Sequence, residues 1–263
     1  MAERAQAAAA LARYYDLDLQ DDPGDVDLYL ALAESVDGPV LELMAGSGRV
    51  AVPLALAGHH VVAVDRDAAM LARAAAYWQS VKDRAPKSGK LELVERDLGS
   101  YKRKAGFGLV ILALNSLLLL DGRDAQRTAF QVIARSLAPK GRAVIDVWLP
   151  APEDLALYDG RLVLDWVKRD EESGTTVSKT TSARYESAAR TAHVTSFFDE
   201  WRGTDSPTRT IRQDEVKLVS SDELGQYAHD VGLIVDTIGG DYEMGHFTPD
   251  SERVVMVFRS TAR

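Results

Sequence analysis

The sequence contains no cysteine among its 263 residues. This absence excludes disulfide bridges, zinc sites with thiolate ligands, cysteine nucleophiles and iron–sulfur clusters. Basic residues are also in deficit, because 31 lysines and arginines face 40 aspartates and glutamates and leave a net charge of −9. Proteins that bind nucleic acid normally carry a basic footprint, so this balance argues against a DNA or RNA partner. We expect a small-molecule substrate instead.

Long hydrophobic runs are missing as well. No segment reaches the roughly 18 apolar residues that a membrane-spanning helix needs, and charges interrupt the alanine-rich beginning of the sequence, unlike a signal peptide. We therefore expect a cytoplasmic protein with no membrane partner. Hydrophobic residues make up 46% of the chain and charged ones 27%, which is typical of a globular protein with a sizeable core.

Up to about residue 150 the sequence alternates between short apolar strands and helices. Two helices, 2–15 and 25–36, come first, and Asp25 is the predicted N-cap of the second. Strands alternating with helices at this spacing predict a parallel sheet covered on both faces. The predicted strands are 40–43, 60–64, 91–94, 109–114 and 141–148, and the predicted helices between them include 49–56, 68–82 and 124–137.

The pattern changes after Pro150. Four polar, β-rich runs separated by turn residues lie between 161 and 219 and predict an antiparallel meander. A helix at 221–230 and strands at 233–238 and 253–259 then return to the earlier pattern. We predict four parts: a helical lid at 1–37, an α/β ligand-binding core at 38–150, a β-rich insertion at 151–219, and a helix and β-hairpin at 220–263 that complete the core.

A glycine loop follows the first predicted strand. The loop Gly46-Ser47-Gly48 lets the backbone pass close to a ligand, and the next helix offers its unpaired N–H groups there. Asp65 ends the second strand, where a carboxylate is suited to bind both hydroxyls of a ribose. Glu42 lies inside the first strand and Asp97 follows the third. These positions predict a ribose-containing ligand, although GSGRVA alone also fits the NAD-binding pattern G-x-G-x-x-G/A.

In order and spacing, several segments resemble the successive motifs of class I S-adenosylmethionine-dependent methyltransferases. They are VLELMAGSGRVAVPLALAG, VVAVDRDAAMLARA, LELVERDL, LVILALNSLLLL and SLAPKGRAVIDVW. The segments YYDLD and GGDYEMGHFTPDSERVVMV and the β-rich insertion are similar to a bacterial small-molecule branch related to antibiotic-pathway N-methyltransferases. The resemblance implies a Rossmann-like, seven-stranded, mostly parallel sheet whose last strand is antiparallel. It also implies S-adenosyl-L-methionine as cofactor and S-adenosyl-L-homocysteine as product.

The resemblance assigns roles to individual residues. Glu42 approaches the methionine ammonium, Asp65 holds the ribose, Asp97 contacts the adenine amino group, and Leu114 with Asn115 lines the sulfonium end. The complete predicted cofactor set is Tyr15, Glu42, Met44, Ala45, Gly46, Gly48, Asp65, Arg66, Met70, Asp97, Leu98 and Leu114.

The predicted acceptor site uses residues from several segments. Tyr14 belongs with Tyr15 to the N-terminal lid, and Tyr242 is a further predicted substrate contact. Trp148 is predicted either to form one wall of the substrate site or to pack in the hydrophobic core. His193 is predicted either to line a pocket or to pack within a lid. His246 lies in the loop after a predicted parallel strand, and this loop is expected on the ligand side of the sheet. His246 is therefore the candidate general base. Asn115 is the second predicted catalytic residue, and no metal is expected.

Met44 is a departure from the family pattern, which usually has glycine at this position. If the backbone there needs φ > 0, methionine is costly, and if it needs only close approach, methionine narrows the pocket. A non-catalytic protein that binds an adenosyl ligand is therefore one alternative, and an NAD-dependent oxidoreductase is another. A nucleic-acid methyltransferase ranks lower, because the net charge is acidic.

The predicted reaction is methyl transfer to a small-molecule amine or hydroxyl by in-line displacement. Sulfonium is a good leaving group, so the protein mainly aligns the reactants and excludes water. An amine needs no strong base, whereas a hydroxyl acceptor needs one such as His246. The insertion is predicted to select the acceptor or to form the contact of a homodimer.

Overall fold

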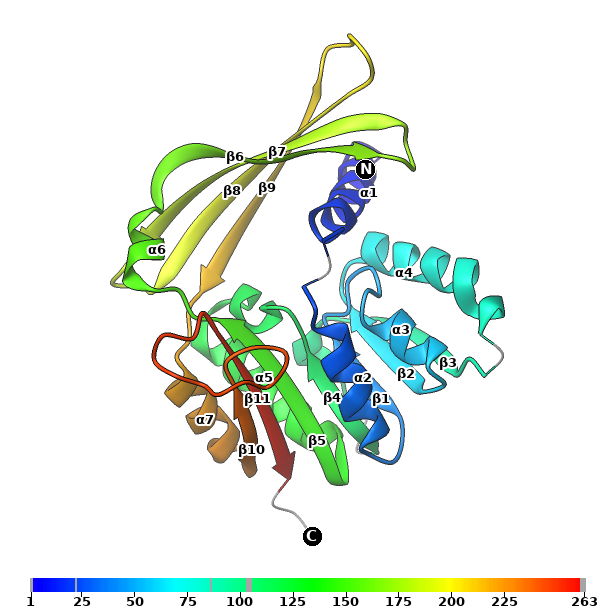
Figure 1. Ribbon diagram of the computed structural model, residues 1–263, viewed down its shortest axis with the longest axis vertical. Coiled ribbons are helices and arrows are strands. Elements are labelled where there is room, and N and C mark those ends of the chain that lie inside the picture. Colours follow the sequence, from blue (N-terminus) through cyan, green and yellow to red (C-terminus); the bar gives the residue numbers. More distant parts are fainter. Residues whose placement is uncertain (1, 22, 86, 103–105, 261–263) are drawn as a thin grey trace. The chain divides into compact units, whose positions relative to one another are not determined.

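The computed structural model describes residues 2–21, 23–85, 87–102 and 106–260. The chain divides into two compact units, each built from separate segments. The smaller unit combines Met1–Asp21 with Pro150–Leu218, and the larger unit combines Asp22–Leu149 with Val219–Arg263. Helix α1 therefore lies in the smaller unit and α2 in the larger one (Figure 1).

The larger unit is built on a seven-stranded sheet with the order β10-β11-β5-β4-β1-β2-β3. Its central strands are parallel, whereas β11 pairs antiparallel with both β5 and β10. This topology confirms the predicted fold class. The strands are β1 (Val40–Leu43), β2 (His60–Asp65), β3 (Lys90–Glu95), β4 (Phe107–Leu112), β5 (Leu137–Trp148), β10 (Leu233–Gly239) and β11 (Arg253–Ser260).

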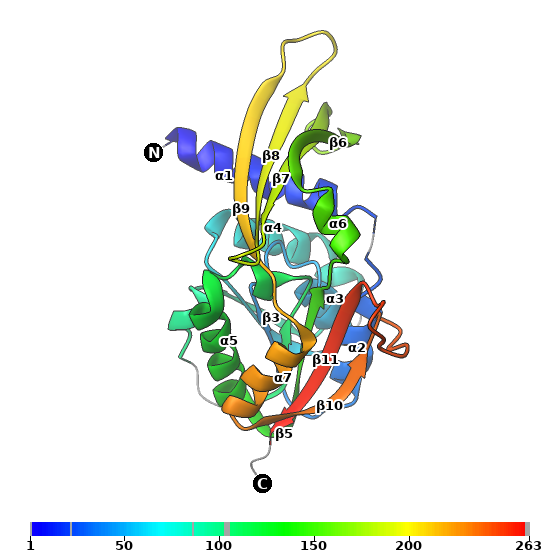
Figure 2. The same ribbon diagram turned by 90° about the vertical axis from the view of Figure 1, so that its left-hand side faces the viewer.

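Helices cover both faces of this sheet. Figure 2 shows α2 and α3 on one side and α5 and α7 on the other, and α4 packs beside α3. Because both faces are covered, β1 and β4 are buried along their whole length and have nearly continuous apolar sequences. The helices are α2 (Val26–Glu34), α3 (Ala51–Leu56), α4 (Ala68–Val81), α5 (Gly122–Ser136) and α7 (Ser221–Asp230), with 3-10 turns η1 (Lys82–Arg84), η2 (Leu98–Ser100) and η3 (Ser116–Leu119).

Local sequence explains where several helices begin. Ser220 and Glu223 form a reciprocal capping box at the start of α7. Asp67 caps α4 by accepting a hydrogen bond from the Ala69 N–H at 2.8 Å. Asp25 occupies the predicted N-cap position of α2, but its carboxylate makes no capping bond and binds Arg49 instead.

The smaller unit contains a four-stranded antiparallel sheet in the order β6-β7-β8-β9, which confirms the predicted meander. Tyr14 and Leu17 of α1 pack with Val177 and Phe198 of the sheet in a small buried core. Helix α1 thus covers one face of a sheet that lies far from it in sequence. The elements are α1 (Ala2–Asp18), α6 (Pro152–Ala156), β6 (Asp159–Asp170), β7 (Thr175–Glu186), β8 (Thr191–Trp201) and β9 (Thr208–Lys217).

Candidate functional site

The glycine loop after β1 is held by the end of β2. Gly46 has φ 56° and donates its N–H to Asp65 Oδ2 at 2.8 Å. Gly48 has φ 81°, and a Cβ added there would lie 2.9 Å from the Ala74 Cβ of α4. Both glycines are therefore needed for backbone conformation, and Gly48 also allows the loop to approach α4 closely.

Met44 precedes these glycines and has φ 57°. The position therefore requires the left-handed backbone that glycine adopts most readily, and a residue with a Cβ is strained there by about 1–2 kcal/mol. The next residue, Ala45, is buried and its N–H donates to the Val64 carbonyl at 3.0 Å. Met44 itself is half-buried.

Asp65 ends β2 and organises the backbone on two sides. Besides the bond from Gly46, its Oδ1 accepts the Asp67 N–H at 2.8 Å. Its carboxylate is half-buried, so part of its surface remains open to a ligand. Of the two predicted cofactor residues that follow, Arg66 is exposed and Met70 is half-buried in α4.

Asp97 lies on the neighbouring strand end. It follows β3, and the Arg96 N–H just before it donates to the Asp65 carbonyl at 2.8 Å. The Asp97 side chain is exposed and caps η2 by accepting the Gly99 N–H at 2.9 Å. Leu98 beside it is buried. The structure therefore brings Asp65 and Asp97 to the same edge of the sheet.

Glu42 is a buried carboxyl group inside β1, with only 3% of its surface exposed. Its Oε2 atom has no hydrogen-bond partner among the described residues. Burial raises the pKa of Glu42 to about 8, although the charge of Arg49 opposes this shift. An isolated buried carboxyl oxygen is costly, so a ligand donor at this position would be stabilising.

An ion pair that sequence analysis did not identify lies beside Glu42. Arg49 makes two hydrogen bonds of 2.6 Å to Asp25, whose carboxylate is fully buried. The two-pronged geometry fixes the guanidinium of Arg49 at the start of α3. Sequence spacing gives no signal for this pair, because its residues lie 24 positions apart on different elements.

The end of β4 has an unusual backbone. Leu114 and Asn115 are consecutive non-glycine residues with φ 47° and 65°. Asn115 Oδ1 accepts the Trp148 N–H at 2.6 Å, so this side chain links the ends of β4 and β5. Three predicted site residues, Leu114, Asn115 and Trp148, are therefore brought together, and all three are half-buried.

Asp146 of β5 is the centre of a second cluster that sequence analysis missed. Its buried carboxylate accepts hydrogen bonds from Tyr29, Leu114, Tyr242 and Arg253. Burial raises the pKa of Asp146, while these donors oppose the shift. Burial also raises the pKa values of the Tyr29 and Tyr242 hydroxyls, with the Asp146 charge adding to it. Tyr242 was predicted from the sequence, but its partner lies 96 positions away.

The predicted catalytic histidine lies in the loop between β10 and β11. His246 is exposed, and a single β-bridge joins it to Gly239. His193 lies on β8 of the smaller unit and is also exposed, 3.5 Å from both Glu186 and Glu215. Their predicted roles stay predictions.

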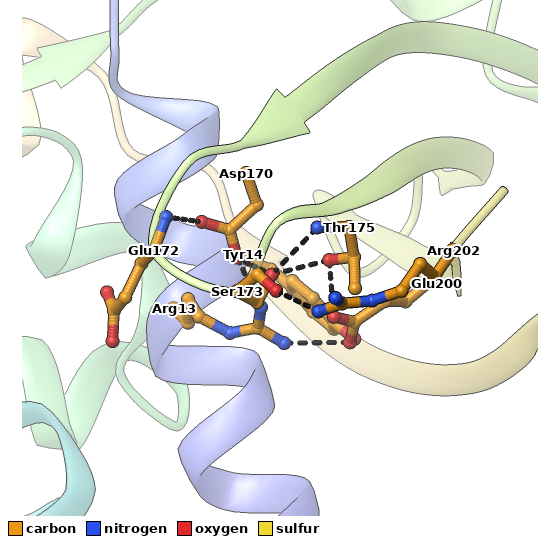
Figure 3. Close-up of polar contacts among 8 residues, drawn as sticks. All are labelled: Arg13, Tyr14, Asp170, Glu172, Ser173, Thr175, Glu200 and Arg202. Carbon is orange, nitrogen blue, oxygen red and sulfur yellow. Dashed lines mark hydrogen bonds and ion pairs between the residues drawn. The ribbon is translucent and has the colours of Figure 1, made fainter.

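Tyr14 lies inside the smaller unit, where it connects α1 to the sheet (Figure 3). Its ring stacks on Phe198 with 4.9 Å between centroids, and its hydroxyl donates to Glu200 at 2.6 Å. Arg13 pairs with both Glu200 and Asp170. Burial and the bond to Glu200 raise the pKa of Tyr14 to about 12. Tyr15, the next residue of α1, is half-buried.

Two features are absent from the part of the chain that the structure describes. No group of histidine, aspartate and glutamate side chains that could hold a metal ion occurs among these residues. No helix within them is both long enough and apolar enough to cross a membrane.

Residues 40–141 match a family model described as a methyltransferase domain. This match confirms the methyltransferase core that the motifs predict. No curated protein matches the sequence significantly.

Solved structures share the fold across nearly the whole chain. The CcbJ methyltransferase from Streptomyces caelestis is 21% identical, with a TM-score of 0.74 and coverage of 91% of this chain and 96% of that one. An S-adenosylmethionine-dependent methyltransferase from Clostridium acetobutylicum is 17% identical, with a TM-score of 0.77 and coverage of 95% and 98%. The sugar N-methyltransferase KedS8 from Streptoalloteichus is 16% identical, with a TM-score of 0.69 and coverage of 93% and 90%.

Proposed function

Because residues 40–141 are a methyltransferase domain, we propose that the protein transfers a methyl group from S-adenosylmethionine to a small-molecule acceptor. The observation that carries this proposal is the arrangement of Glu42, Asp65 and Asp97 at neighbouring strands around the glycine loop. The strand order β1-β2-β3 places these carboxyl groups along one edge of the sheet. Ligands of open α/β sheets bind at this edge.

The residues at this edge fit the chemistry of the cofactor. Asp65 is oriented by the glycine loop and binds the ribose hydroxyls, while Asp97 and buried Leu98 contact the adenine. The unpartnered Oε2 of Glu42 accepts a hydrogen bond from the methionine ammonium. When bound, S-adenosylmethionine would supply a methyl carbon on a positively charged sulfur. An acceptor lone pair would form the new bond to this carbon in line, while the carbon–sulfur bond breaks and S-adenosylhomocysteine leaves. The role of the chain is alignment and exclusion of water.

We infer that the acceptor group is an amine. KedS8, which shares the fold, is named a sugar N-methyltransferase. His246, the candidate base, is exposed and is joined to Gly239 by a backbone bridge, and among the described residues no hydrogen bond or ion pair holds its side chain. A hydroxyl acceptor requires a positioned base, whereas an amine requires only that its lone pair be free. An amino sugar or another small amine therefore fits better than an alcohol.

Calorimetric titration with S-adenosylmethionine and, separately, with NADH tests the cofactor. We expect micromolar binding of S-adenosylmethionine and no heat from NADH. Binding of NADH alone would replace the proposal with an oxidoreductase. If S-adenosylmethionine binds but no methyl group reaches a panel of amines and phenols, the protein is a non-catalytic adenosyl-ligand binder.

The acceptor group is tested with methyl-labelled S-adenosylmethionine and pairs of sugars that differ only in an amine or a hydroxyl. Transfer to the amine member alone is expected, and the His246→Ala variant should keep most of this activity. Loss of turnover in that variant, with cofactor and acceptor binding intact, would instead indicate a base-dependent acceptor.

We further propose that the insertion selects the acceptor, with a homodimer contact as the alternative role. His193 is the predicted substrate residue to test, because it is exposed on β8. A His193→Ala variant should change the preference among amine acceptors without changing the affinity for S-adenosylmethionine. Unchanged selectivity, with a change in oligomeric state, would favour the dimer contact.

A further inference from the structure

Asp146 has an unusually complete set of hydrogen-bond donors. Its Oδ1 accepts the Tyr29 hydroxyl at 2.6 Å and the Leu114 N–H at 2.7 Å. Its Oδ2 accepts the Tyr242 hydroxyl at 2.9 Å and Nη1 of Arg253 at 2.7 Å. A carboxylate has about four acceptor positions, so these donors occupy all of them. Asp146 therefore has no free position for a ligand, and any effect on the reaction passes through its partners.

One set of partners belongs to the turn after β4. The Leu114 N–H binds the Asp146 carboxylate, and the Asn115 N–H binds the Asp146 carbonyl at 3.3 Å. These two residues have left-handed backbones, which non-glycine residues adopt only where surrounding contacts hold them. Asp146 supplies two of those contacts. It therefore helps to fix the backbone of the turn that carries the Asn115 side chain.

The other set of partners belongs to the loop at 240–252, which joins β10 to β11 (Figure 1). The Gly240 N–H binds the Gly245 carbonyl at 2.9 Å, and the Gly245 N–H binds Asp241 at 2.8 Å, so the first part of the loop is compact. Tyr242 connects this part to Asp146, and the Arg253 guanidinium lies 4.6 Å from the centre of the Tyr242 ring. The same segment carries His246.

We propose that Asp146 is a positioning residue that fixes the turn at Asn115 and the loop carrying His246 relative to each other. This inference rests on the proposed function, because both segments carry residues predicted for the acceptor side of methyl transfer. Tyr29 of α2 and Arg253 of β11 hold the carboxylate between them, so its position is set from both sides. Alignment to within a fraction of an ångström controls the rate of such a transfer.

Amide hydrogen exchange of the Asp146→Asn variant tests the inference. An asparagine amide keeps one acceptor oxygen. Its NH2 group can only donate hydrogen bonds, so it cannot accept those from the donors that face it. We expect about tenfold faster exchange in both 113–116 and 240–247, with unchanged exchange in the glycine loop at 44–48. Asp236→Asn is the matched control, because Asp236 lies on β10 of the same sheet and, within the part of the chain that the structure describes, pairs with Arg142 and Arg259 near the surface.

Methyl transfer gives a second measurement, with the amino sugars of the acceptor panel as probes. Asp146→Asn should lower kcat about tenfold and leave the affinity for S-adenosylmethionine within about threefold. If Asp146→Asn does not fold, Tyr242→Phe and Tyr29→Phe each remove one hydroxyl from the same carboxylate. Tyr242→Phe removes the direct link and should accelerate exchange at 240–247 most, whereas Tyr29→Phe acts there only through the position of Asp146 and should accelerate it less.

Uniformly faster exchange over the whole larger unit would overturn the inference, because Asp146 would then act only as a general core residue. Unchanged exchange in the two segments would overturn it as well, as would equal effects of the two tyrosine variants at 240–247. The proposed function fails separately, if the wild-type protein does not bind S-adenosylmethionine in the calorimeter. Hydrogen exchange still decides the role of Asp146 in that case.

Discussion

At Met44 a methionine occupies a backbone conformation that favours glycine. Sequence comparison identifies the residue as a departure from the family pattern but does not give its φ angle. The structure gives that angle, 57°, so the departure stores local strain beside the proposed cofactor site. Met44 is half-buried, so its side chain also contributes packing that offsets part of this strain.

Two substitutions separate the backbone strain at Met44 from the side-chain packing. Met44→Ala removes most of the side chain and keeps the Cβ, whereas Met44→Gly removes both. We expect the glycine variant to be more stable than the alanine variant by about 1 kcal/mol in urea unfolding. This order is the reverse of the usual one, in which alanine is the more stable. Greater stability of the alanine variant would contradict the strain assigned to this residue.

Glu42 predicts a pH dependence of cofactor binding. Its pKa of about 8 without ligand means that the carboxyl is mostly protonated at pH 7. A bound ammonium favours the charged form and lowers this pKa, so binding releases a proton and affinity rises with pH up to about 8. Titrations in two buffers of different ionisation enthalpy measure the released proton.

Glu42→Gln is the control for this measurement. The variant keeps the size of the side chain, and the ammonium group of S-adenosylmethionine titrates in the same way with both proteins. The difference between wild type and variant therefore isolates Glu42. Equal proton release by the two proteins would show that Glu42 does not change its charge when the cofactor binds.

At the scale of elements, α1 is attached to the small sheet by a network of charged and aromatic groups. The hydrogen bonds from Arg13, Thr175 and Tyr14 lower the pKa of Glu200 to about 2, against the opposing effect of burial. A carboxylate whose pKa is lower in the folded protein than in the unfolded chain stabilises the folded state at pH values above the unfolded-chain pKa. This stabilisation is lost as the pH falls toward the pKa of the folded protein. The attachment of α1 should therefore weaken between about pH 4.5 and 2.

Exchange of the amides at 10–18, corrected for the intrinsic effect of pH, measures this weakening. In Glu200→Gln the amides should exchange faster already at neutral pH and depend less on pH below 4.5. Glu215→Gln is the control, because Glu215 is an exposed residue of β9 that lies close to Lys217 and His193 and not to α1 residues Arg13 and Tyr14, which bind Glu200. The same exchange profile in both variants would show that Glu200 does not hold α1.

The sequence predicts the elements well where one local pattern determines them. The alternation of apolar strands and helices placed β1 and α7 at their observed bounds, and turn residues located the four strands of the meander. The glycine loop, Asp65 and Asp97 can be proposed as cofactor residues from the sequence, because family spacing and local backbone chemistry coincide there. Asp25 lies at its predicted N-cap position, but its carboxylate binds a distant partner, Arg49, in place of the helix N–H groups.

Contacts between distant segments were not predictable from local patterns. Asp146 lies in a strand segment, VIDVW, in which one aspartate among apolar residues gives no indication of its partners. Tyr29, Leu114 and Tyr242 meet it only because strand order brings four elements together. The same reason explains why the sequence gives no indication of the contacts that Tyr14 makes with Phe198 and Glu200. Its predicted role in substrate binding stays a prediction.

At the scale of the whole molecule, the division into two units predicts how the protein unfolds. The proposed cofactor residues, apart from Tyr15, lie in the larger unit. A ligand stabilises the unit that it binds, by about 2.7 kcal/mol at a concentration of 100 times Kd. In calorimetric unfolding, S-adenosylmethionine should therefore raise the transition temperature of the larger unit and leave the transition temperature of the smaller unit unchanged. A single transition that shifts as a whole would show that the two units unfold together.

The interleaving of the units also determines the order in which the chain can fold as it is synthesised. Helix α1 is synthesised before its partners Val177 and Phe198, which follow some 160 to 180 residues later. Strand β5 likewise cannot pair with β11 until the chain has been synthesised beyond Arg253, where β11 begins. Neither unit can close before most of the chain has been made, so apolar surfaces such as the α1 face with Tyr14 and Leu17 remain uncovered during synthesis. Slow translation would prolong that exposure and make chaperone binding most important for this early helix.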